Sequence, residues 1–391
     1  MGTGQVAAAR AWLGRPLLFE TFPFATSLDT TPAGSEITDS AAGATAMATG
    51  RRVAHGVISR EIPGSGSNLV TAAEILAARG RRIGLLTTSY MVDATPAAWL
   101  AHTSSRYDYT SIAAQYLSAS SLDVVLGGGT LPSAAEWGAV GFTVVTNSSS
   151  LATAVANGAT RIASAFDVGV IPYEYDGLGH CPSLAAMTRA ALAVLGQHPE
   201  GMFLMIEGGR IDHAAHANDL VRCIHEVVGL EAATREVLHW AATRDDVLVL
   251  VTADHETGGL EVLEERGAGQ LPVVRWNSAG HTAARVALYA WGAGAARALG
   301  ARHLTDVYRV MTDPSFPPPE IRALQVADGR HRLEWLAISG RVYHVEITLT
   351  PCSTPWLFLA AVTSAVNGLT GLELPQLLAT NVIFYRLGQP E

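Results

Sequence analysis

Two short segments of the 391-residue chain place carboxylates and imidazoles at spacings that suit metal binding. Asp212 and His216 are four residues apart, so on a helix they share one face, where this pair of side chains favours zinc. A helix start with polar surface residues has the same spacing and is the simpler alternative for this pair alone. Asp254 and His255 are adjacent after a short apolar run and could place two ligands on one ion. His281 stands in a loop of small residues, and taken alone it is better explained as a structural histidine.

Ser40 is a candidate nucleophile. It lies where a short loop enters an Ala-rich segment, and the free N–H groups and dipole of a helix start favour an anion there. Thr38 or Asp39 could instead simply cap that helix. A serine nucleophile normally needs a base, but zinc coordination can replace the base by lowering the pKa of the hydroxyl.

Three further residues could contact a phosphate group or a harder ion. Glu207 follows an apolar run and could hold an ion that prefers oxygen ligands. Thr95 could offer its hydroxyl to a magnesium-like ion, and Arg106 could form paired hydrogen bonds with two phosphate oxygens. Each of these residues is a weak indication of a site when taken alone. Only their combination with the other candidate residues strengthens the prediction.

These candidates follow the ends of predicted strands in an alternating α/β pattern. Short, continuously apolar runs are typical of strands buried on both faces, and the runs between them have helical period and good helix formers. The expected strands are Arg82–Thr87, Leu122–Leu126, Met202–Ile206 and Val247–Val251. The expected helices are Leu69–Ala78, Leu184–Leu195 and Leu220–Ala241. This alternation predicts a three-layer α/β/α sandwich with a mostly parallel central sheet, whose sites lie at the carboxyl ends of its strands.

A proline cluster divides the chain. Residues 313–320 read as a stiff linker, because clustered prolines fit neither a helix interior nor a central strand. We therefore expect a catalytic domain over residues 1–312 and a small β-sandwich over residues 321–391. Its expected strands are Arg332–Ile338, Arg341–Thr348, Trp356–Val362 and Asn381–Leu387.

Composition excludes several classes of protein. Apolar residues make up 49% of the chain, which excludes a wholly disordered protein. The 26 basic residues, all arginine, against 35 acidic ones give a net charge of −9, which argues against nonspecific nucleic-acid binding. Three distant cysteines form neither a complete disulfide framework nor a zinc ribbon, so their pairing stays open. The uncharged stretch Ile347–Leu372 is too interrupted for a membrane span, and the first residues do not read as a signal peptide.

Six motifs together resemble those of one family. In chain order they are TDSAAGATA, DATP, HTSSR, EGGRIDHAAH, TADHETGG and the pair His281–Thr282, and they resemble the alkaline phosphatases. The resemblance spans Met1 to about Met311, nearly the whole first domain. It implies hydrolysis of small-molecule phosphate monoesters through a phosphoserine on Ser40, with two zinc ions and one magnesium ion.

The resemblance also implies a role for each candidate residue. The implied metal ligands are Asp212, His216 and His281 for one zinc, Asp254 and His255 for the other, and Glu207 and Thr95 for magnesium. The other implied site residues are the nucleophile Ser40, the phosphate clamp Arg106 and, supporting them, Asp39, Asp93, His102 and His213.

One departure from the family concerns the start of the chain. The family begins with a buried strand ending in Asp-Gly-Met-Gly, whose Asp bridges the second zinc and the magnesium, whereas Met1–Gly4 matches only the tail of that motif. We expect the natural protein to start upstream, with Met1 an internal methionine. An in-frame stop codon directly before Met1 would contradict this expectation.

Further expectations rest on the same resemblance. They are a periplasmic or extracellular location and a possible homodimer, since members of the family often dimerise; the charge and the interrupted apolar stretch already argue against a nucleic-acid partner and a membrane span. The C-terminal module more weakly resembles small β-domains appended to secreted bacterial enzymes. Two alternative functions stay open: an inactive, truncated remnant that binds metal or phosphate, and a phosphodiesterase of the same superfamily.

Overall fold

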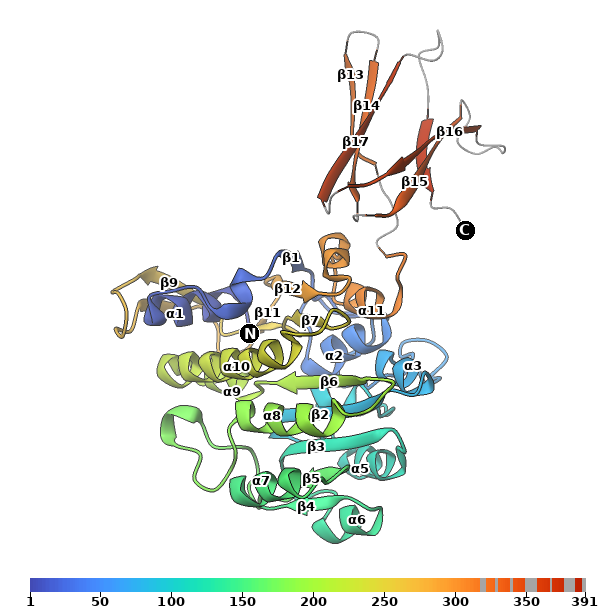
Figure 1. Ribbon diagram of the computed structural model, residues 1–391. Helices are drawn as coiled ribbons and strands as arrows, with labels where there is room; N and C mark the ends of the chain where they lie inside the picture. Colours follow the sequence, from blue (N-terminus) through green and yellow to red (C-terminus); the bar gives the residue numbers. More distant parts are fainter. Residues whose placement is uncertain are drawn as a thin grey trace.

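The computed structural model describes residues 1–316 and six later segments. These segments are residues 321–327, 330–337, 340–348, 357–365, 368–375 and 384–388. The first part is a three-layer α/β structure, and the later segments form two small antiparallel sheets (Figure 1). The expected fold class is confirmed.

A five-stranded parallel sheet forms the larger half of the core. Its strand order is β4-β5-β3-β2-β6, and β2 pairs with β6 from Arg82–Met202 to Thr87–Glu207. Side chains alternate across it, since Leu85 joins the core on one face while Leu86 joins the core on the other. The strands are β2 (Arg82–Tyr90), β3 (Leu122–Gly128), β4 (Thr143–Val145), β5 (Ile162–Ser164) and β6 (Met202–Glu207).

A second sheet of three antiparallel strands continues the middle layer. Its order is β1-β12-β7, so β7 pairs with β12 rather than with any parallel strand. Two short antiparallel pairs, β9 with β10 and β8 with β11, are formed by the chain between β7 and β12. The strands are β1 (Phe24–Leu28), β7 (Leu248–Val251), β8 (Glu256–Thr257), β9 (Leu260–Glu264), β10 (Val273–Trp276), β11 (His281–Thr282) and β12 (Val286–Gly292).

Helices cover both faces of these sheets. One core packs α2, α3, α5 and α11 against the sheets, and a second packs α7 and α8 against the other face of β3. The helices are α1 (Thr3–Leu13), α2 (Ser40–Thr49), α3 (Ala72–Ala78), α4 (Ala94–Ala97), α5 (Tyr109–Ser118), α6 (Ala134–Ala139), α7 (Ser148–Ala156), α8 (Leu184–Leu195), α9 (Arg210–His216), α10 (Leu220–Ala241) and α11 (Thr305–Thr312). Three 3₁₀ turns span Leu18–Thr21, Glu174–Asp176 and Ala295–Gly300.

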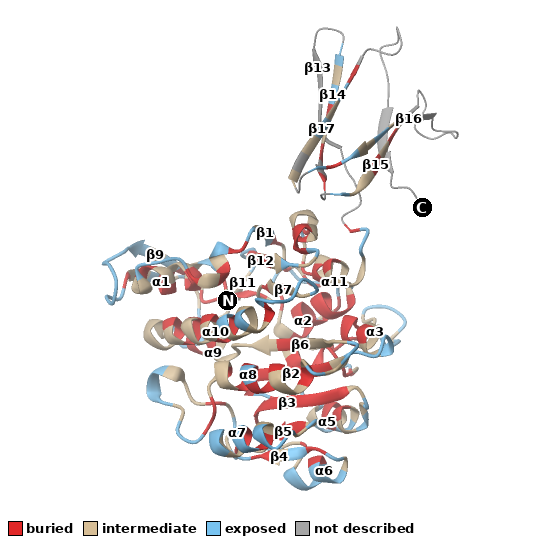
Figure 2. Ribbon diagram, in the orientation of Figure 1, coloured by how far each residue is buried: buried red, intermediate tan, exposed pale blue. Residues whose placement is uncertain are grey.

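Burial differs sharply along the central layer (Figure 2). All residues of β3 are buried, whereas Met205 is the one buried residue of β6. In β7, Leu248 and Leu250 are only partly buried. The sequence predicts β6 and β7 to be buried on both faces, and this expectation is wrong for β6. The reason is a cavity of about 810 Å³ that separates β6 from β7 and is lined by both.

The C-terminal segments form two three-stranded sheets with a common core. Leu333 and Trp335 of one sheet pack with Tyr343 and Val345 of the other. The strands are β13 (Ile321–Ala327), β14 (Arg330–Ala337) and β17 (Gly368–Pro375) in one sheet, and β15 (Val342–Thr348), β16 (Leu357–Thr363) and β18 (Phe384–Gly388) in the other. Of the expected features here, linker residues 317–320, strand residues 338, 356 and 381–383, and Cys352 lie outside the described residues.

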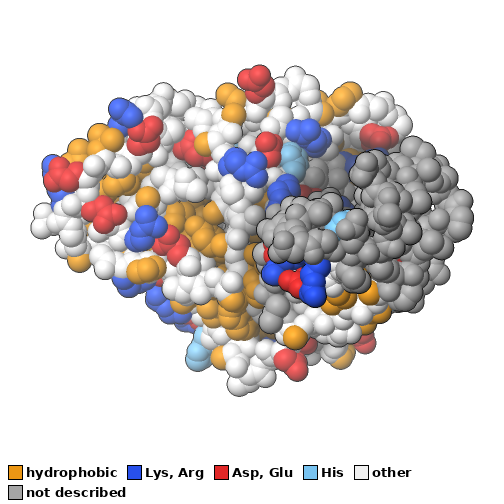
Figure 3. Space-filling model, turned by 90° about the horizontal axis from the view of Figure 1, so that it is seen from above, with side chains coloured by type: hydrophobic (Ala, Val, Ile, Leu, Met, Phe, Trp, Pro, Cys, Tyr) orange, Lys and Arg blue, Asp and Glu red, His pale blue; other side chains and the backbone are white. Residues whose placement is uncertain are grey.

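Two properties of the surface bear on partners. Within the residues that the structure describes, no helix is long and apolar enough to cross a membrane. On the face seen in Figure 3, acidic and basic side chains are interspersed outside the grey region.

Candidate active site

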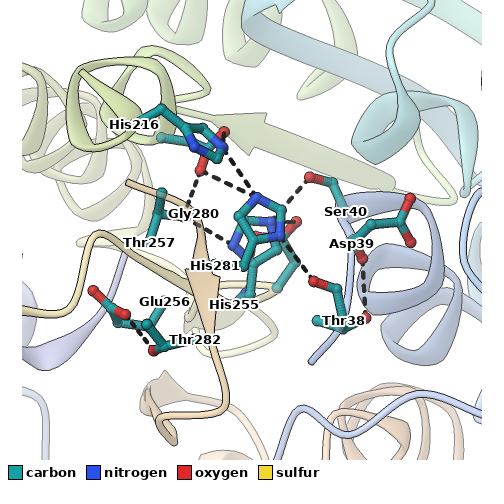
Figure 4. A network of polar contacts seen from close by, with 12 residues as sticks. Thr38, Asp39, Ser40, His216, His255, Glu256, Thr257, Gly280, His281 and Thr282 are labelled. Carbon is teal, nitrogen blue, oxygen red and sulfur yellow. Dashed lines mark hydrogen bonds and ion pairs between the residues drawn. The ribbon is translucent and has the colours of Figure 1, made fainter. Parts of the chain in front are cut away.

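Three predicted ligands from distant parts of the chain meet beyond the carboxyl ends of β6 and β7. Asp212 and His216 lie on one face of the short helix α9, as their spacing predicts, and His281 comes from β11. One ligand atom from each lies within 4.8 Å of those of the other two. We call Asp212, His216 and His281 the histidine group. Figure 4 shows its two histidines, His216 and His281, close to Ser40 and His255.

The hydrogen bonds around the histidine group turn the Nε2 atoms of both imidazoles toward its centre. Nδ1 of His216 lies 2.7 Å from the carbonyl of Ala279, and Nδ1 of His281 lies 2.8 Å from the carbonyl of Thr38. A carbonyl only accepts, so each Nδ1 must donate, and each neutral imidazole then carries a lone pair on Nε2. The two Nε2 atoms are 3.1 Å apart and lie 3.4 and 3.7 Å from carboxylate oxygens of Asp212. A divalent cation satisfies all of these acceptors at once, so the donor set fits a metal such as zinc.

A second cluster joins Ser40 to Asp254 and His255. The Ser40 Oγ lies 3.0 Å from Nε2 of His255, and a carboxylate oxygen of Asp254 lies 3.2 Å from the same nitrogen. The rings of His255 and His281 stack with centroids 3.5 Å apart, so this cluster adjoins the histidine group. Burial alone would raise the pKa of Asp254, but the facing His255 lowers it below its ordinary value. Burial would likewise lower the pKa of His255, but Asp254 raises it.

Thr257 connects the two clusters, and the sequence analysis missed it. Its hydroxyl donates to Asp212 and lies 3.1 Å from Nδ1 of His255. Because the single hydroxyl proton goes to the carboxylate, the Thr257 oxygen accepts from Nδ1 of His255. Nε2 of His255 then faces both Ser40 and the carboxylate of Asp254. The motif TADHETGG contains Thr257, but only the fold shows that it faces Asp212.

Two carboxylates hold the guanidinium of Arg106, and one of them belongs to Asp39, the residue before Ser40. Its guanidinium donates to Asp39 at 3.3 Å and to Asp93 at 3.1 Å. Burial would lower the pKa of Arg106, but these two carboxylates raise it, so the group stays charged. Asp39 also caps α2 by accepting from the backbone N–H of Ala42 at 3.1 Å. Asp39 therefore caps the helix, as considered from sequence, and also contacts Arg106.

Glu207 lies in a third cluster that contains only oxygen ligands. The hydroxyl of Thr87 donates to the Glu207 carboxylate, and the hydroxyl of Thr95 is close enough to lower the pKa of that carboxyl. Desolvation by burial raises the pKa of Glu207 to about 7. Carboxylate and hydroxyl oxygens suit a magnesium-like ion. We call Glu207, Thr95 and Thr87 the oxygen group; Thr87 was not among the residues predicted from sequence.

Two predicted supporting histidines have other partners. The ring of His102 hydrogen-bonds to the carbonyl of Ser59 at 2.9 Å and to Glu74 at 3.0 Å, and these contacts do not reach the predicted ligands. His213 follows Asp212 on α9, and its Nδ1 lies 2.9 Å from the guanidinium of Arg210. Burial and the charge of Arg210 lower the pKa of His213, so it is neutral near pH 7.

Comparisons with known proteins agree with the geometry. A family model described as alkaline phosphatase matches residues 1–274. Alkaline phosphatase 3 of Bacillus subtilis is 33% identical over 238 residues, which cover 58% of this chain and 50% of the relative. Alkaline phosphatase H of Pseudomonas aeruginosa is 30% identical over 347 residues, which cover 70% of this chain and 72% of that protein. The chain thus spans about half the length of the Bacillus relatives it matches.

Solved structures give the same result for the fold. A cold-active alkaline phosphatase from the psychrophile Shewanella has a TM-score of 0.71 and 27% identity, covering 80% of this chain and 96% of that one. The alkaline phosphatase of the Antarctic bacterium TAB5 also has a TM-score of 0.71, at 24% identity, covering 81% of this chain and 94% of that one.

Proposed function

The chain belongs to the alkaline phosphatase family, and on this premise we propose that it hydrolyses phosphate monoesters through a phosphoserine formed on Ser40. The observation that carries the proposal is the position of one hydroxyl. Ser40 begins α2, its Oγ lies 3.0 Å from a buried histidine nitrogen, and Arg106 is bound by Asp93 and by Asp39, the residue before Ser40. A helix start and a charged guanidinium both stabilise a phosphate group at that point.

The donor sets fit three cations. The histidine group would hold one zinc ion, Asp254 and His255 with Ser40 a second, and Glu207 with Thr95 a magnesium ion. One of the similar solved structures, a TAB5 alkaline phosphatase variant, is described with magnesium bound in its M3 site. When bound, such ions supply positive charge that lowers the pKa of a hydroxyl and stabilises the oxygens of an in-line displacement.

The residues of the chain account for two successive displacements. In the first, Ser40 Oγ loses its proton and forms a bond to phosphorus while the bond to the ester oxygen breaks, and the alcohol leaves after taking a proton. In the second, the oxygen of a water molecule bonds to phosphorus and the Ser40 bond breaks, which releases phosphate and restores the hydroxyl. Arg106 offsets the charge on the phosphoryl oxygens in both steps.

Hydrolysis of two chromogenic esters tests this proposal. With added zinc and magnesium, p-nitrophenyl phosphate should be hydrolysed much faster than bis-p-nitrophenyl phosphate. Ser40→Ala should abolish phosphoenzyme formation and turnover while metal content stays near normal, and the exposed Ser35→Ala serves as the matched control. Turnover retained in Ser40→Ala would rule out Ser40 as the nucleophile.

The same assay separates the alternatives. Preference for the diester would indicate a phosphodiesterase, and hydrolysis of neither ester by a folded sample would indicate a remnant that binds metal or phosphate. Family membership also supports a homodimer and a periplasmic or extracellular location, which sedimentation velocity and cell fractionation test.

A further inference from the structure

Three tyrosines form a cluster next to the guanidinium of Arg106. They are Tyr90 at the end of β2, Tyr107 in the loop before α5, and Tyr109 at the start of α5, and we call them the tyrosine cluster. The ring centroids of Tyr107 and Tyr109 are 6.4 Å apart, and those of Tyr90 and Tyr109 are 6.5 Å apart. The Cζ atom of Arg106 lies 5.9 Å from the centroid of the Tyr107 ring. The cluster therefore begins at the side chain that we propose binds the phosphate group.

The tyrosine cluster is open to solvent although its backbone is well fixed. Tyr107 is 73% exposed and Tyr90 is 41% exposed, whereas Tyr109 is partly buried. Tyr90 and Tyr109 belong to a strand and a helix, and the backbone N–H of Arg106 donates to the carbonyl of Gly56 at 2.7 Å. Single exposed apolar side chains are common on protein surfaces, but three neighbouring rings form a continuous apolar surface. Because the backbone is already ordered, a ligand can bind to this surface without ordering a loop.

The geometry of the cluster suits a further aromatic ring. Aromatic rings pack with centroids about 4.5–7 Å apart, in offset-stacked or edge-to-face arrangements. The rings of Tyr107 and Tyr109 already meet edge to face, at 89°. Burial raises the pKa of Tyr109, and the negative charge of Asp93 raises it further, so this ring stays neutral. A planar aromatic group can therefore pack on Tyr107 in the same way, whereas an aliphatic alcohol offers no ring for such a contact.

The distance from the phosphate group favours one kind of ligand. In the phosphate ester of an aromatic alcohol, a single oxygen atom joins phosphorus to the ring. A phosphate group bound to Arg106 therefore keeps the attached ring close to the side chains that flank this guanidinium. Tyr107 is such a side chain, and its exposed ring leaves room for a partner.

We propose that the tyrosine cluster is a subsite for the leaving group and that it favours phosphate monoesters of aromatic alcohols over those of aliphatic alcohols. This inference rests on the proposed function, because it takes Arg106 as the residue that binds the phosphate group. The tyrosines bind the ring and take no part in making or breaking bonds. Such a contact forms in the bound substrate and persists in the transition state, so it lowers KM and leaves kcat nearly unchanged.

Kinetics with two monoesters test the proposal. 1-Naphthyl phosphate carries an aromatic alcohol, and glycerol 2-phosphate carries an aliphatic one. Tyr107→Ala should lower kcat/KM about fivefold for 1-naphthyl phosphate, mainly through KM, and less than about twofold for glycerol 2-phosphate, because one aromatic pair changes affinity about two- to tenfold. Tyr107→Trp should retain the preference. Tyr175→Ala is the control, since Tyr175 is also exposed but packs against His225 instead.

The result that contradicts the proposal is a loss of the same size for both esters in Tyr107→Ala, or no loss for either. An equal loss would show that Tyr107 acts through the position of Arg106 and not on the leaving group. If Tyr107→Ala converts a dimer into a monomer in sedimentation velocity without changing the preference between the esters, the cluster is a contact between subunits and the proposal is wrong.

Phosphonate binding separates a failure of the subsite from a failure of the proposed function. In benzylphosphonate a CH₂ group replaces the ester oxygen of an aromatic ester, so this compound and methylphosphonate bind without being hydrolysed. Calorimetry with zinc and magnesium present should show benzylphosphonate binding about fivefold more tightly than methylphosphonate, and Tyr107→Ala should remove that difference. Equal affinities in the starting protein would overturn the subsite even if both esters are hydrolysed. The expected difference without hydrolysis of either ester would support the subsite and refute the proposed activity.

Discussion

The histidine group and the oxygen group lie at the same edge of the molecule but differ in how they are built. The histidine group opens to solvent through His216, and its two imidazole Nε2 atoms face each other at 3.1 Å. The oxygen group stands at the end of β6, where desolvation raises the pKa of Glu207 to about 7. In the first, lone pairs converge with no positive charge between them, and in the second, partial desolvation makes the charged form of the carboxylate less stable. We therefore expect the histidine group to bind an ion that prefers nitrogen ligands, and the oxygen group to bind an ion that prefers oxygen ligands.

The largest effect should follow from breaking the histidine group. Asp212→Asn removes the carboxylate that both imidazoles face, so we expect kcat/KM for p-nitrophenyl phosphate to fall about 1000-fold, with a loss of bound zinc. Steady-state kinetics and metal analysis measure both. His239→Ala, an exposed histidine on α10, is the control and should leave activity unchanged. Activity of Asp212→Asn within tenfold of the starting protein would show that the histidine group is not catalytic.

A substitution in the oxygen group should remove magnesium without removing zinc. Glu207→Gln keeps the shape but removes the charge, so we expect a loss of about 100-fold in kcat/KM together with lost magnesium, while zinc remains bound. Metal analysis after gel filtration separates the two ions. If zinc leaves together with magnesium, the two groups form one coupled site and the distinction between them is wrong.

Glu226 tests whether a raised pKa alone marks a functional carboxylate. Burial raises its pKa to about 7, as for Glu207, but it faces the backbone N–H of Glu174 and the charges of Asp176 and Arg210. An acid whose pKa is raised by folding holds its proton more tightly in the native state, so stability falls as pH rises from about 4.5 through 7. We expect Glu226→Gln to stabilise the protein by about 2 kcal/mol at pH 8 and little at pH 4, measured by urea denaturation. Equal effects at both pH values would contradict this.

Thr257 should give the smallest effect, because it acts through other residues. Thr257→Val removes the hydroxyl that orients Asp212 and His255, so zinc affinity should fall about tenfold. Competition with a chelator measures this affinity. Thr252→Val is the matched control, since that hydroxyl bonds only to the carbonyl of Ala287. Added zinc should restore most activity in Thr257→Val, and failure to restore it would point to a different role.

Much of the local structure could be predicted from the sequence. The helix α8 has the predicted bounds Leu184–Leu195, and α10 has the predicted bounds Leu220–Ala241, because their helical period and composition agree over many residues. The spacing of Asp212 and His216 correctly predicted a shared helix face. Shorter or less regular segments gave weaker signals, and strands β1, β4, β5, β8 to β13 and β17 were not predicted.

The candidate site, like the fold, could be predicted from the sequence only in part. Residue types and short spacings, which the sequence determines through backbone periodicity, identified Ser40, Asp212, His216 and Asp254 as candidates, and pointed to His281 only through the family motif. Tertiary structure alone decided that His281 faces His216, that the carbonyls of Thr38 and Ala279 set the state of both rings, and that β6 and β7 face a cavity. The reason is physical: a spacing of four residues is set by one turn of helix, whereas contacts between residues tens or hundreds apart depend on how the whole chain packs.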